Sequence, residues 1–200
     1  MKNKLLNLDK LDSHDAGEKY HFAKELLQMS KENPALLYPY FDRWVKLLNG
    51  DNNVLKWVAT DIIGHLSAVD SENKTITQID SLLKFLHGGN LITCNHAIFS
   101  LGLIAKNKPD LRARIIKELL AVSKDVFNSD ECRDIAMGKV IDTLHGFRAE
   151  IQGDEAAMNF IGQTQLSTRN ATKLKADALM RRITKASKEP VGAKRMVHVN

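Results

Sequence analysis

Three side chains around one predicted turn are of the types that bind zinc. His87 precedes the turn at 88–90, and Cys94 and His96 follow it. A structural zinc ion takes four ligands, with thiols usually in closely spaced pairs, so this group is one ligand short and has no CxxC pair. Cys94 and His96 are also two residues apart in a predicted helix and point to different sides. The spacing therefore predicts polar turn residues and one buried thiol, and we expect no metal and no cofactor.

Other catalytic patterns are missing from the sequence. Ser, His and Asp are plentiful, but no serine lies in a GxSxG frame, the usual setting of a nucleophile on a sharp turn. The glycine pair Gly88-Gly89 is not followed by the Gly-Lys-Ser/Thr ending of a phosphate-binding loop. We therefore expect a protein that is not an enzyme.

The basic side chains are concentrated at the C-terminus. Residues 166–200 hold nine basic and two acidic side chains, a net charge of +7, whereas the other residues hold twenty basic and twenty-two acidic ones, a net charge of −2. Such a segment attracts phosphate backbones or acidic protein surfaces. No aromatic residue follows Phe160, so a stacking platform for single-stranded nucleic acid is absent there. A solubilising end of the molecule and a nucleic-acid-binding segment both remain open. The candidate basic patch consists of Arg169, Lys173, Arg181, Arg182 and Lys185.

The elements that would position these residues are helices. Apolar residues recur at helical spacing along most of the chain, and the polar turns between the stripes are rich in Asn, Gly and Asp. We expect a loosely ordered N-terminus at 1–12, a helical domain at 13–185 and a basic mobile tail at 186–200. The last helix is expected to dock through an apolar stripe of Ala171, Leu174, Ala178, Leu179 and Ile183. Thr75 and Gln78 have the spacing of a capping box.

The chain repeats itself with an offset of 38 residues. The segment 54–66 aligns with 92–104, which places Ala59 on Ala97 and Gly64 on Gly102. A weaker third copy follows around Ala136, with its glycine displaced from the expected register. A period of this length in a helical pattern is typical of stacked helix pairs.

The repeated segment resembles the HEAT repeat of the armadillo-like families. It has a polar turn, a Val, a basic residue, small residues and an apolar-Gly pair; in the first copy these are Asp51, Val54, Lys56, Ala59 and Ile63-Gly64. The second copy has Cys94 in the register of the basic residue. The resemblance implies an all-α fold, a right-handed α-α superhelix, or solenoid, of about four to five HEAT-like helix pairs.

The resemblance also implies where a partner would bind. Solenoids of this family present a curved surface lined by the second helix of each pair, so we expect a non-catalytic scaffold that binds a partner protein there. The candidate binding residues on this concave face are Lys56, Asp61, Asn95, Arg133 and Lys139. A nucleic-acid-binding module that uses the basic C-terminal helix and tail is the alternative.

A third interpretation comes from the same resemblance. Some DNA-repair glycosylases hold damaged DNA in a HEAT-like solenoid, with a carboxylate and aromatic residues on the concave face. Asp61 lies four residues after Trp57 and fits that description, although the chain is short for such an enzyme.

The expected compartment is the cytoplasm. No run of residues approaches the roughly 18 consecutive apolar residues that a membrane helix needs. Two cysteines are too few for a disulfide framework, so we expect Cys94 and Cys132 to be reduced.

Overall fold

The computed structural model describes residues 6–188, and the regular elements within that range are all helices. The expectation of an all-α protein is therefore confirmed for the described residues. The α-helices are α1 (Ala16–Glu32), α2 (Phe41–Leu48), α3 (Asn53–Leu66), α4 (Ile79–Leu86), α5 (Leu91–Asn107), α6 (Pro109–Ala121), α7 (Asp130–Leu144), α8 (Arg148–Ile151), α9 (Glu155–Gln165) and α10 (Asn170–Lys188). The short 3-10 helices are η1 (Asp9–Asp12), η2 (Pro34–Leu36), η3 (Tyr38–Tyr40), η4 (Lys74–Gln78), η5 (Val122–Lys124) and η6 (His145–Phe147).

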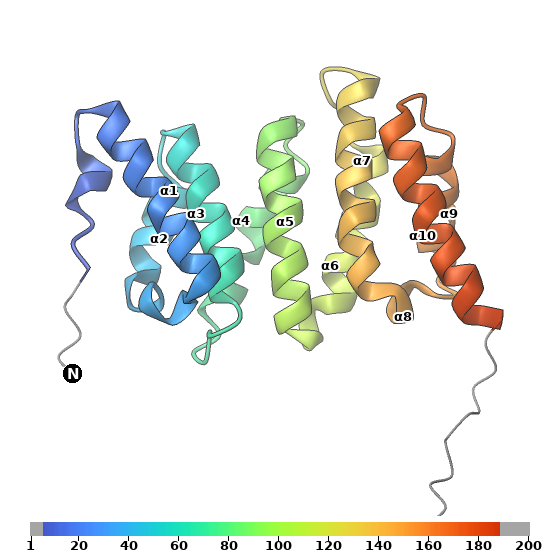
Figure 1. Cartoon of the computed structure of the whole chain (residues 1–200), viewed down its shortest axis with the longest axis horizontal. Coiled ribbons are helices and arrows are strands. Elements are labelled where there is room, and N and C mark those ends of the chain that lie inside the picture. Colours follow the sequence, from blue (N-terminus) through green and yellow to red (C-terminus); the bar gives the residue numbers. More distant parts are fainter. Residues whose placement is uncertain (1–5, 189–200) are drawn as a thin grey trace, which may run out of the picture.

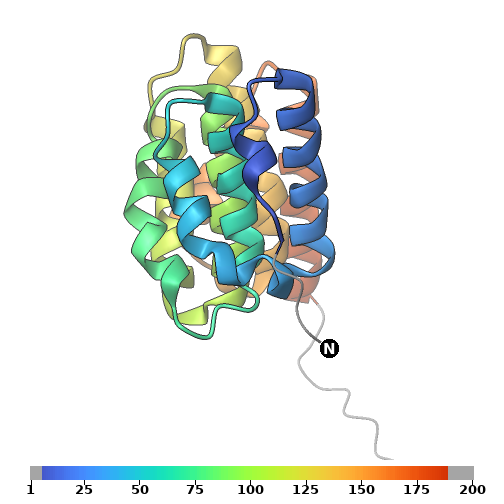
Figure 2. The same cartoon turned by 90° about the vertical axis from the view of Figure 1, so that its left-hand side faces the viewer.

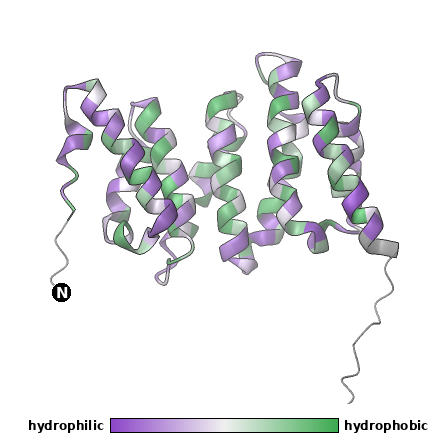
Figure 3. Ribbon diagram, viewed as in Figure 1, coloured by the Kyte–Doolittle hydropathy of each residue, from purple (hydrophilic) through white to green (hydrophobic). Residues whose placement is uncertain are grey.

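The helices form two layers. The front row consists of α1, α3, α5, α7 and α10, which pack side by side in that order (Figure 1). The back row consists of α2, α4, α6 and α9, each of which packs against a front-row helix (Figure 2). The apolar side chains between the rows form one continuous core, in which Trp44 is fully buried and donates a hydrogen bond from Nε1 to the Leu37 carbonyl at 3.0 Å. In Figure 3, α5 at the centre of the front row is hydrophobic along most of its length.

The front-row helices begin at equivalent residues with similar caps. The side chains of Asn52, Asn90 and Ser129 accept hydrogen bonds from the backbone N–H groups of Leu55, Thr93 and Cys132, at 3.1, 3.0 and 3.2 Å. Each cap satisfies an N–H group that has no partner within its own helix. The caps of α3, α5 and α7 therefore set the register in which the repeats stack.

Glycines let the front-row helices approach closely. A Cβ atom on Gly64 would lie 2.8 Å from Ser100 Cα in α5, and one on Gly102 would lie 2.7 Å from Thr143 Cγ2 in α7. A Cβ atom on Gly138 would lie 2.9 Å from Thr172 Oγ1 in α10. Gly138 therefore makes the same kind of contact as the other two glycines, although its spacing along the sequence differs.

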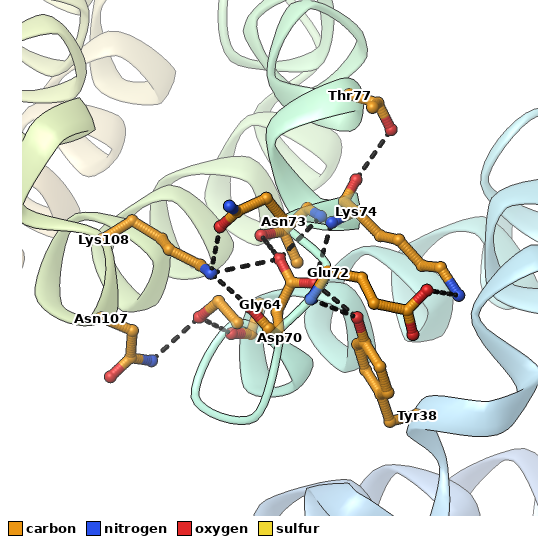
Figure 4. A network of polar contacts seen from close by, with 11 residues as sticks. Tyr38, Gly64, Asp70, Glu72, Asn73, Lys74, Thr77, Asn107 and Lys108 are labelled. Carbon is orange, nitrogen blue, oxygen red and sulfur yellow. Dashed lines mark hydrogen bonds and ion pairs between the residues drawn. The ribbon is translucent and has the colours of Figure 1, made fainter.

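A buried carboxylate joins three successive helix pairs (Figure 4). Asp70, in the loop after α3, accepts hydrogen bonds from Tyr38 Oη at 2.7 Å and from the backbone N–H groups of Lys74 and Thr75 at 2.8 and 3.0 Å. Lys108, which precedes α6, places Nζ 3.4 Å from Asp70 Oδ2 and 2.8 Å from Asn73 Oδ1. Burial raises the pKa of Asp70, but the hydrogen bonds from Thr75 and Tyr38 outweigh it, so the pKa lies below its usual value.

The structure corrects three local expectations. Residues 9–12 form η1, and Leu11 is buried against α1 because it covers the open end of the stack, so the expected loose order at 1–12 is wrong for this part. Thr75 does not cap a helix; its hydroxyl donates to Asp70 instead. The last helix continues to Lys188, past the expected boundary at 185, and residues 189–200 of the expected tail lie outside the described residues.

Candidate functional site

Two aromatic rings from neighbouring front-row helices stack on one another. The Trp57 indole of α3 and the His96 imidazole of α5 have centroids 5.7 Å apart and planes 5° apart. Trp57 Nε1 donates a hydrogen bond to Thr93 Oγ1 at 3.0 Å, which fixes the indole against α5. Both side chains are only half buried, so the stacked pair contributes to the surface of the front row.

A carboxylate holds the imidazole in place. Nδ1 of His96 lies 2.9 and 3.0 Å from the two carboxylate oxygens of Asp61, which is 8% exposed. A carboxylate only accepts hydrogen bonds, so Nδ1 of His96 is the nitrogen that donates to Asp61. An Asp–His pair of this kind can orient a general base, but such a base needs a nucleophile or substrate beside it. In the described part of the chain, the His96 ring contacts the Asp61 carboxylate and the Trp57 indole, and no hydroxyl or thiol is hydrogen-bonded to it.

Large apolar side chains surround this pair and remain exposed to solvent. Ile92 and Phe99 of α5 are 49% and 44% exposed, and Val54 of α3 is 36% exposed. Their three- and four-residue spacing from Trp57 and His96 puts them on the same side of their helices. We call this surface the α3–α5 face, which consists of Val54, Trp57, Asp61, His65, Ile92, His96 and Phe99.

Within the α3–α5 face, His65 of α3 contacts Phe99 of α5. Its ring meets the Phe99 ring edge-on, with centroids 5.4 Å apart and planes 71° apart. Burial lowers the pKa of His65, and Lys31 acts in the same direction, while the Asp61 carboxylate opposes them. The imidazole is therefore neutral at pH 7, which suits an apolar surface.

The five residues predicted to line a concave face do not lie together. Asp61 belongs to the α3–α5 face, and Asn95 is half buried beside His96 on α5, with no hydrogen-bond partner for its buried Oδ1. Lys56 is five residues from Asp61, about 140° around the helix, and its Nζ lies over the Phe85 ring of α4 in the back row.

The same correction applies to α7. Lys139 follows Gly138 just as His65 follows Gly64, so it occupies the equivalent position on the front row and is exposed there. Arg133 is six residues away, about 120° around the helix, and pairs with Asp130 at 2.6 Å. Lys56 and Arg133 are therefore misplaced in the predicted set, because each lies more than about 100° around its helix from the side that carries Asp61 or Lys139.

The predicted basic patch is spread around α10 rather than concentrated. Lys173 and Arg182 are both exposed, but they are nine residues apart and lie about 180° from each other around the helix. Arg181 and Lys185 lie together between them. Arg169 precedes the helix and is half buried. Arg182 Nη1 is 3.5 Å from His145 Nδ1, and burial, followed by this guanidinium, lowers the pKa of His145.

The apolar stripe predicted for α10 is partly wrong. Leu179 and Ile183 are buried as expected, but Thr172 and Ala176 complete the buried side, and Leu174 is 55% exposed. Ala171 is exposed as well. Thr172 is buried because it is the residue that meets Gly138 of α7. The contact with a neighbouring helix, rather than the apolar pattern alone, sets the phase of this helix.

The three residues considered as zinc ligands have other surroundings in the structure. His87 Nδ1 is 2.8 Å from Asp125, and its Nε2 is 3.3 Å from Glu118, within ion-pair range but outside hydrogen-bond geometry. His96 is bound to Asp61, and burial raises the pKa of the Cys94 thiol to about 12. No group of three or more His, Cys, Asp or Glu residues in the described range is arranged to hold a metal ion.

Ile92 and Phe99 were not predicted as site residues from the sequence. A signal for them exists: Ile92 and Phe99 are apolar residues seven apart on the side of α5 that also carries the polar residues Asn95 and His96. An amphipathic helix normally keeps that side polar. Two apolar residues at such positions are therefore a departure from that pattern that can be found in the sequence.

Comparisons with known proteins add no family to this description. No protein-family model matches the chain, and no curated protein matches it at the significance required. Within the described residues, no helix is long and apolar enough to cross a membrane.

Proposed function

We propose that this protein is a non-catalytic scaffold that binds a partner protein on the α3–α5 face. In this proposal the two rows of helices are HEAT-like pairs of an armadillo-like α-solenoid, wound as a right-handed superhelix. The front-row helices pack one after another in chain order, and three glycines bring neighbouring helices of this row close together. Both features support that arrangement. A solenoid of this kind provides an extended surface for binding.

The observation that carries the proposal is the exposure of Ile92 and Phe99 around a stacked ring pair whose geometry is already fixed. Contiguous exposed apolar side chains usually mark an interaction site. Binding energy at protein interfaces is concentrated in a few aromatic and apolar residues held in well-packed surroundings. Trp57 and His96 are held by Thr93 and Asp61 before any partner arrives, so little side-chain entropy is lost on binding.

The chemistry of the face favours protein over nucleic acid. Phosphate backbones are bound mainly by Lys and Arg, and the α3–α5 face has neither among its seven residues. The basic side chains lie instead on α10, where Lys175 pairs with Asp142 and Arg182 lies beside His145. The nucleic-acid alternative therefore depends on Lys173, Arg181, Lys185 and the basic residues beyond the described range.

The test is affinity capture from host lysate, with and without nuclease. We expect the wild-type chain to retain a protein after nuclease treatment. The Ile92→Ala/Phe99→Ala double variant should retain at least tenfold less of it, because truncation of each central apolar residue costs about 1 kcal/mol or more of binding free energy. Leu174→Ala, which removes an equally exposed side chain from α10, is the matched control and should capture the same amount as the wild type.

Two results would overturn the proposal. One is equal capture by the double variant while its thermal unfolding midpoint is unchanged. The other is a captured protein that disappears on nuclease treatment and at high salt, which would transfer the function to the basic C-terminal residues.

A further inference from the structure

A second surface feature lies on the back row, away from the α3–α5 face. A cleft of about 1010 Å³ separates α6 from α9, with α8 at one end. The two helices barely touch because η6 and α8 are inserted between α7 and α9. The cleft belongs to neither the stacked ring pair nor the basic end of α10.

The cleft is long rather than round. On one side its lining residues recur every three or four positions from Pro109 in α6 to Lys124 in η5, and the α6 part alone, at about 1.5 Å per residue, corresponds to roughly 18 Å. On the α9 side Ala156, Phe160 and Gln163 continue the same direction. A groove between two helices of this length matches a third helix better than a compact small molecule.

The floor of the cleft is apolar. Ile116 and Phe160 are 8% and 3% exposed and form part of the core, and Leu120 is half buried next to them. Ala113 and Ala156 have short side chains that leave the groove open on either side. A ligand that fits must therefore present apolar side chains along one side.

Three basic and two acidic side chains line the cleft, and two of the basic ones, both lysines, form no ion pair among the described residues. Lys117 and Lys124 line the α6 side seven residues apart, about two helical turns, and both are exposed. The carboxylates of the cleft are already engaged: Glu150 pairs with Arg112 at 2.6 Å, and Asp154 caps α9 by accepting from Ala157 N at 2.7 Å. None of the ion pairs formed among the described residues includes either lysine.

From this shape and charge we propose that the α6–α9 cleft binds an acidic amphipathic helix of a partner protein. The apolar side of that helix lies on Ile116, Leu120 and Phe160. Its carboxylates, two turns apart, face Lys117 and Lys124. The side-chain amides of Asn159 and Gln163 on the opposite wall are available to its polar edge. This site is independent of the α3–α5 face and adds a second partner surface to the molecule.

The test uses the full chain and two labelled synthetic helical peptides of sixteen or so residues, with fluorescence anisotropy as the readout. Both peptides have apolar residues at positions i, i+3, i+4, i+7 and i+11; one carries Glu and the other Lys on the flanks. We expect the Glu peptide to bind with a dissociation constant in the micromolar range, at least tenfold tighter than the Lys peptide, and more weakly as salt increases.

Three variants distinguish the cleft from a general charge effect. Lys117→Glu/Lys124→Glu should weaken binding of the Glu peptide about tenfold, whereas Lys24→Glu/Lys84→Glu, the same charge change on exposed parts of α1 and α4, should leave it within about twofold. Ala113→Trp, at an exposed position, should block the groove without disturbing the core.

The proposal fails if the Glu and Lys peptides bind equally, if Ala113→Trp leaves the dissociation constant unchanged, or if no binding is seen at about 1 mM peptide. Ile92→Ala/Phe99→Ala should bind the Glu peptide like the wild type. That comparison separates failure of the cleft from failure of the α3–α5 face. Circular dichroism of each variant confirms that the helices are intact.

Discussion

At the scale of single residues, Asp70 is the side chain on which the connections between helix pairs depend most. Its carboxylate is buried and accepts hydrogen bonds from Tyr38, Lys74 and Thr75, while Lys108 lies nearby. Burial, followed by the hydrogen bond to Asp70, raises the pKa of Tyr38 to about 12, so the phenol remains a donor under all ordinary conditions. A buried charge is tolerated only when it is fully hydrogen-bonded, and this one is.

Replacement of Asp70 by Asn should therefore be costly. The amide offers a donor where four hydrogen-bond donors already converge, and it leaves Lys108 without its counter-charge, so we expect a loss of about 3 kcal/mol in the free energy of unfolding. Urea denaturation measures this. Asp80→Asn, which removes the exposed carboxylate that pairs with Arg114, should change the free energy by less than about 1 kcal/mol.

The pH dependence of the stability of the wild type and of Asp70→Asn gives an independent check. Because the folded-state pKa of Asp70 is lowered, its contribution is fully present above the unfolded pKa of about 3.9 and is lost as the pH falls through the folded value. The difference in stability between wild type and Asp70→Asn should shrink on acidification below about pH 4. A constant difference down to pH 2 would contradict this account.

At the scale of elements, the front row is held together by close helix contacts at glycine. Gly64 meets the backbone of Ser100, whereas Gly102 and Gly138 meet threonine side chains. A backbone atom cannot rotate away, so the contact at Gly64 is the least able to accept a larger residue. Protein interiors transmit such a clash to the whole helix because they are densely packed.

Gly64→Ala should destabilise the protein by about 2 kcal/mol, since overpacking of α3 against α5 exceeds the gain in helix propensity. Gly162→Ala is the opposite case: it lies in α9, and its Cβ atom would have no other atom within 4 Å. It should stabilise the protein by about 0.5 to 1 kcal/mol. Thermal unfolding of the two variants measures both effects. Stabilisation by Gly64→Ala would contradict the close contact with Ser100, and destabilisation by Gly162→Ala would contradict the open surroundings of Gly162.

At the scale of the whole molecule, the stack is nearly linear. Each helix of the front row packs mainly on the next, and the main packing partners of α10 are α7 and α9 (Figure 1). In such an arrangement stability is close to a sum of local terms, and an end can open without the rest. The buried Leu11 and η1 close one end of the stack, whereas α10 closes the other.

Leu179→Ala should therefore loosen one end of the molecule selectively. Loss of this buried side chain costs about 3 kcal/mol, which corresponds to roughly hundredfold faster amide exchange in α9 and α10. Amides in α3 and α5 should exchange at the wild-type rate. Native-state hydrogen exchange measures the amide exchange rate of each helix separately. Equal acceleration in all helices would show that the chain unfolds as a single unit.

The sequence predicted those features that depend on neighbours along the chain. The helical class follows from apolar spacing, and the turn predicted at 88–90 lies between α4 and α5 because Gly and Asn act within a few residues. The 38-residue offset predicted that Gly64 and Gly102 occupy equivalent places, and both do contact the next helix of the row. Asp61 was identified as a candidate because it lies one turn after Trp57 in the same helix.

What only the tertiary structure decided is which side of each helix faces a neighbour and which distant residues meet. Asp61 and His96 are 35 residues apart, and their contact depends on how far α5 is rotated against α3. Thr172 rather than Leu174 is buried because Gly138 lies opposite it. The rotation of α3 about its axis likewise decides that Lys56 Nζ lies over the Phe85 ring of α4 in the back row. A helix turns by about 100° per residue, so an uncertainty of one residue moves a side chain from core to solvent, and only packing against other helices removes it.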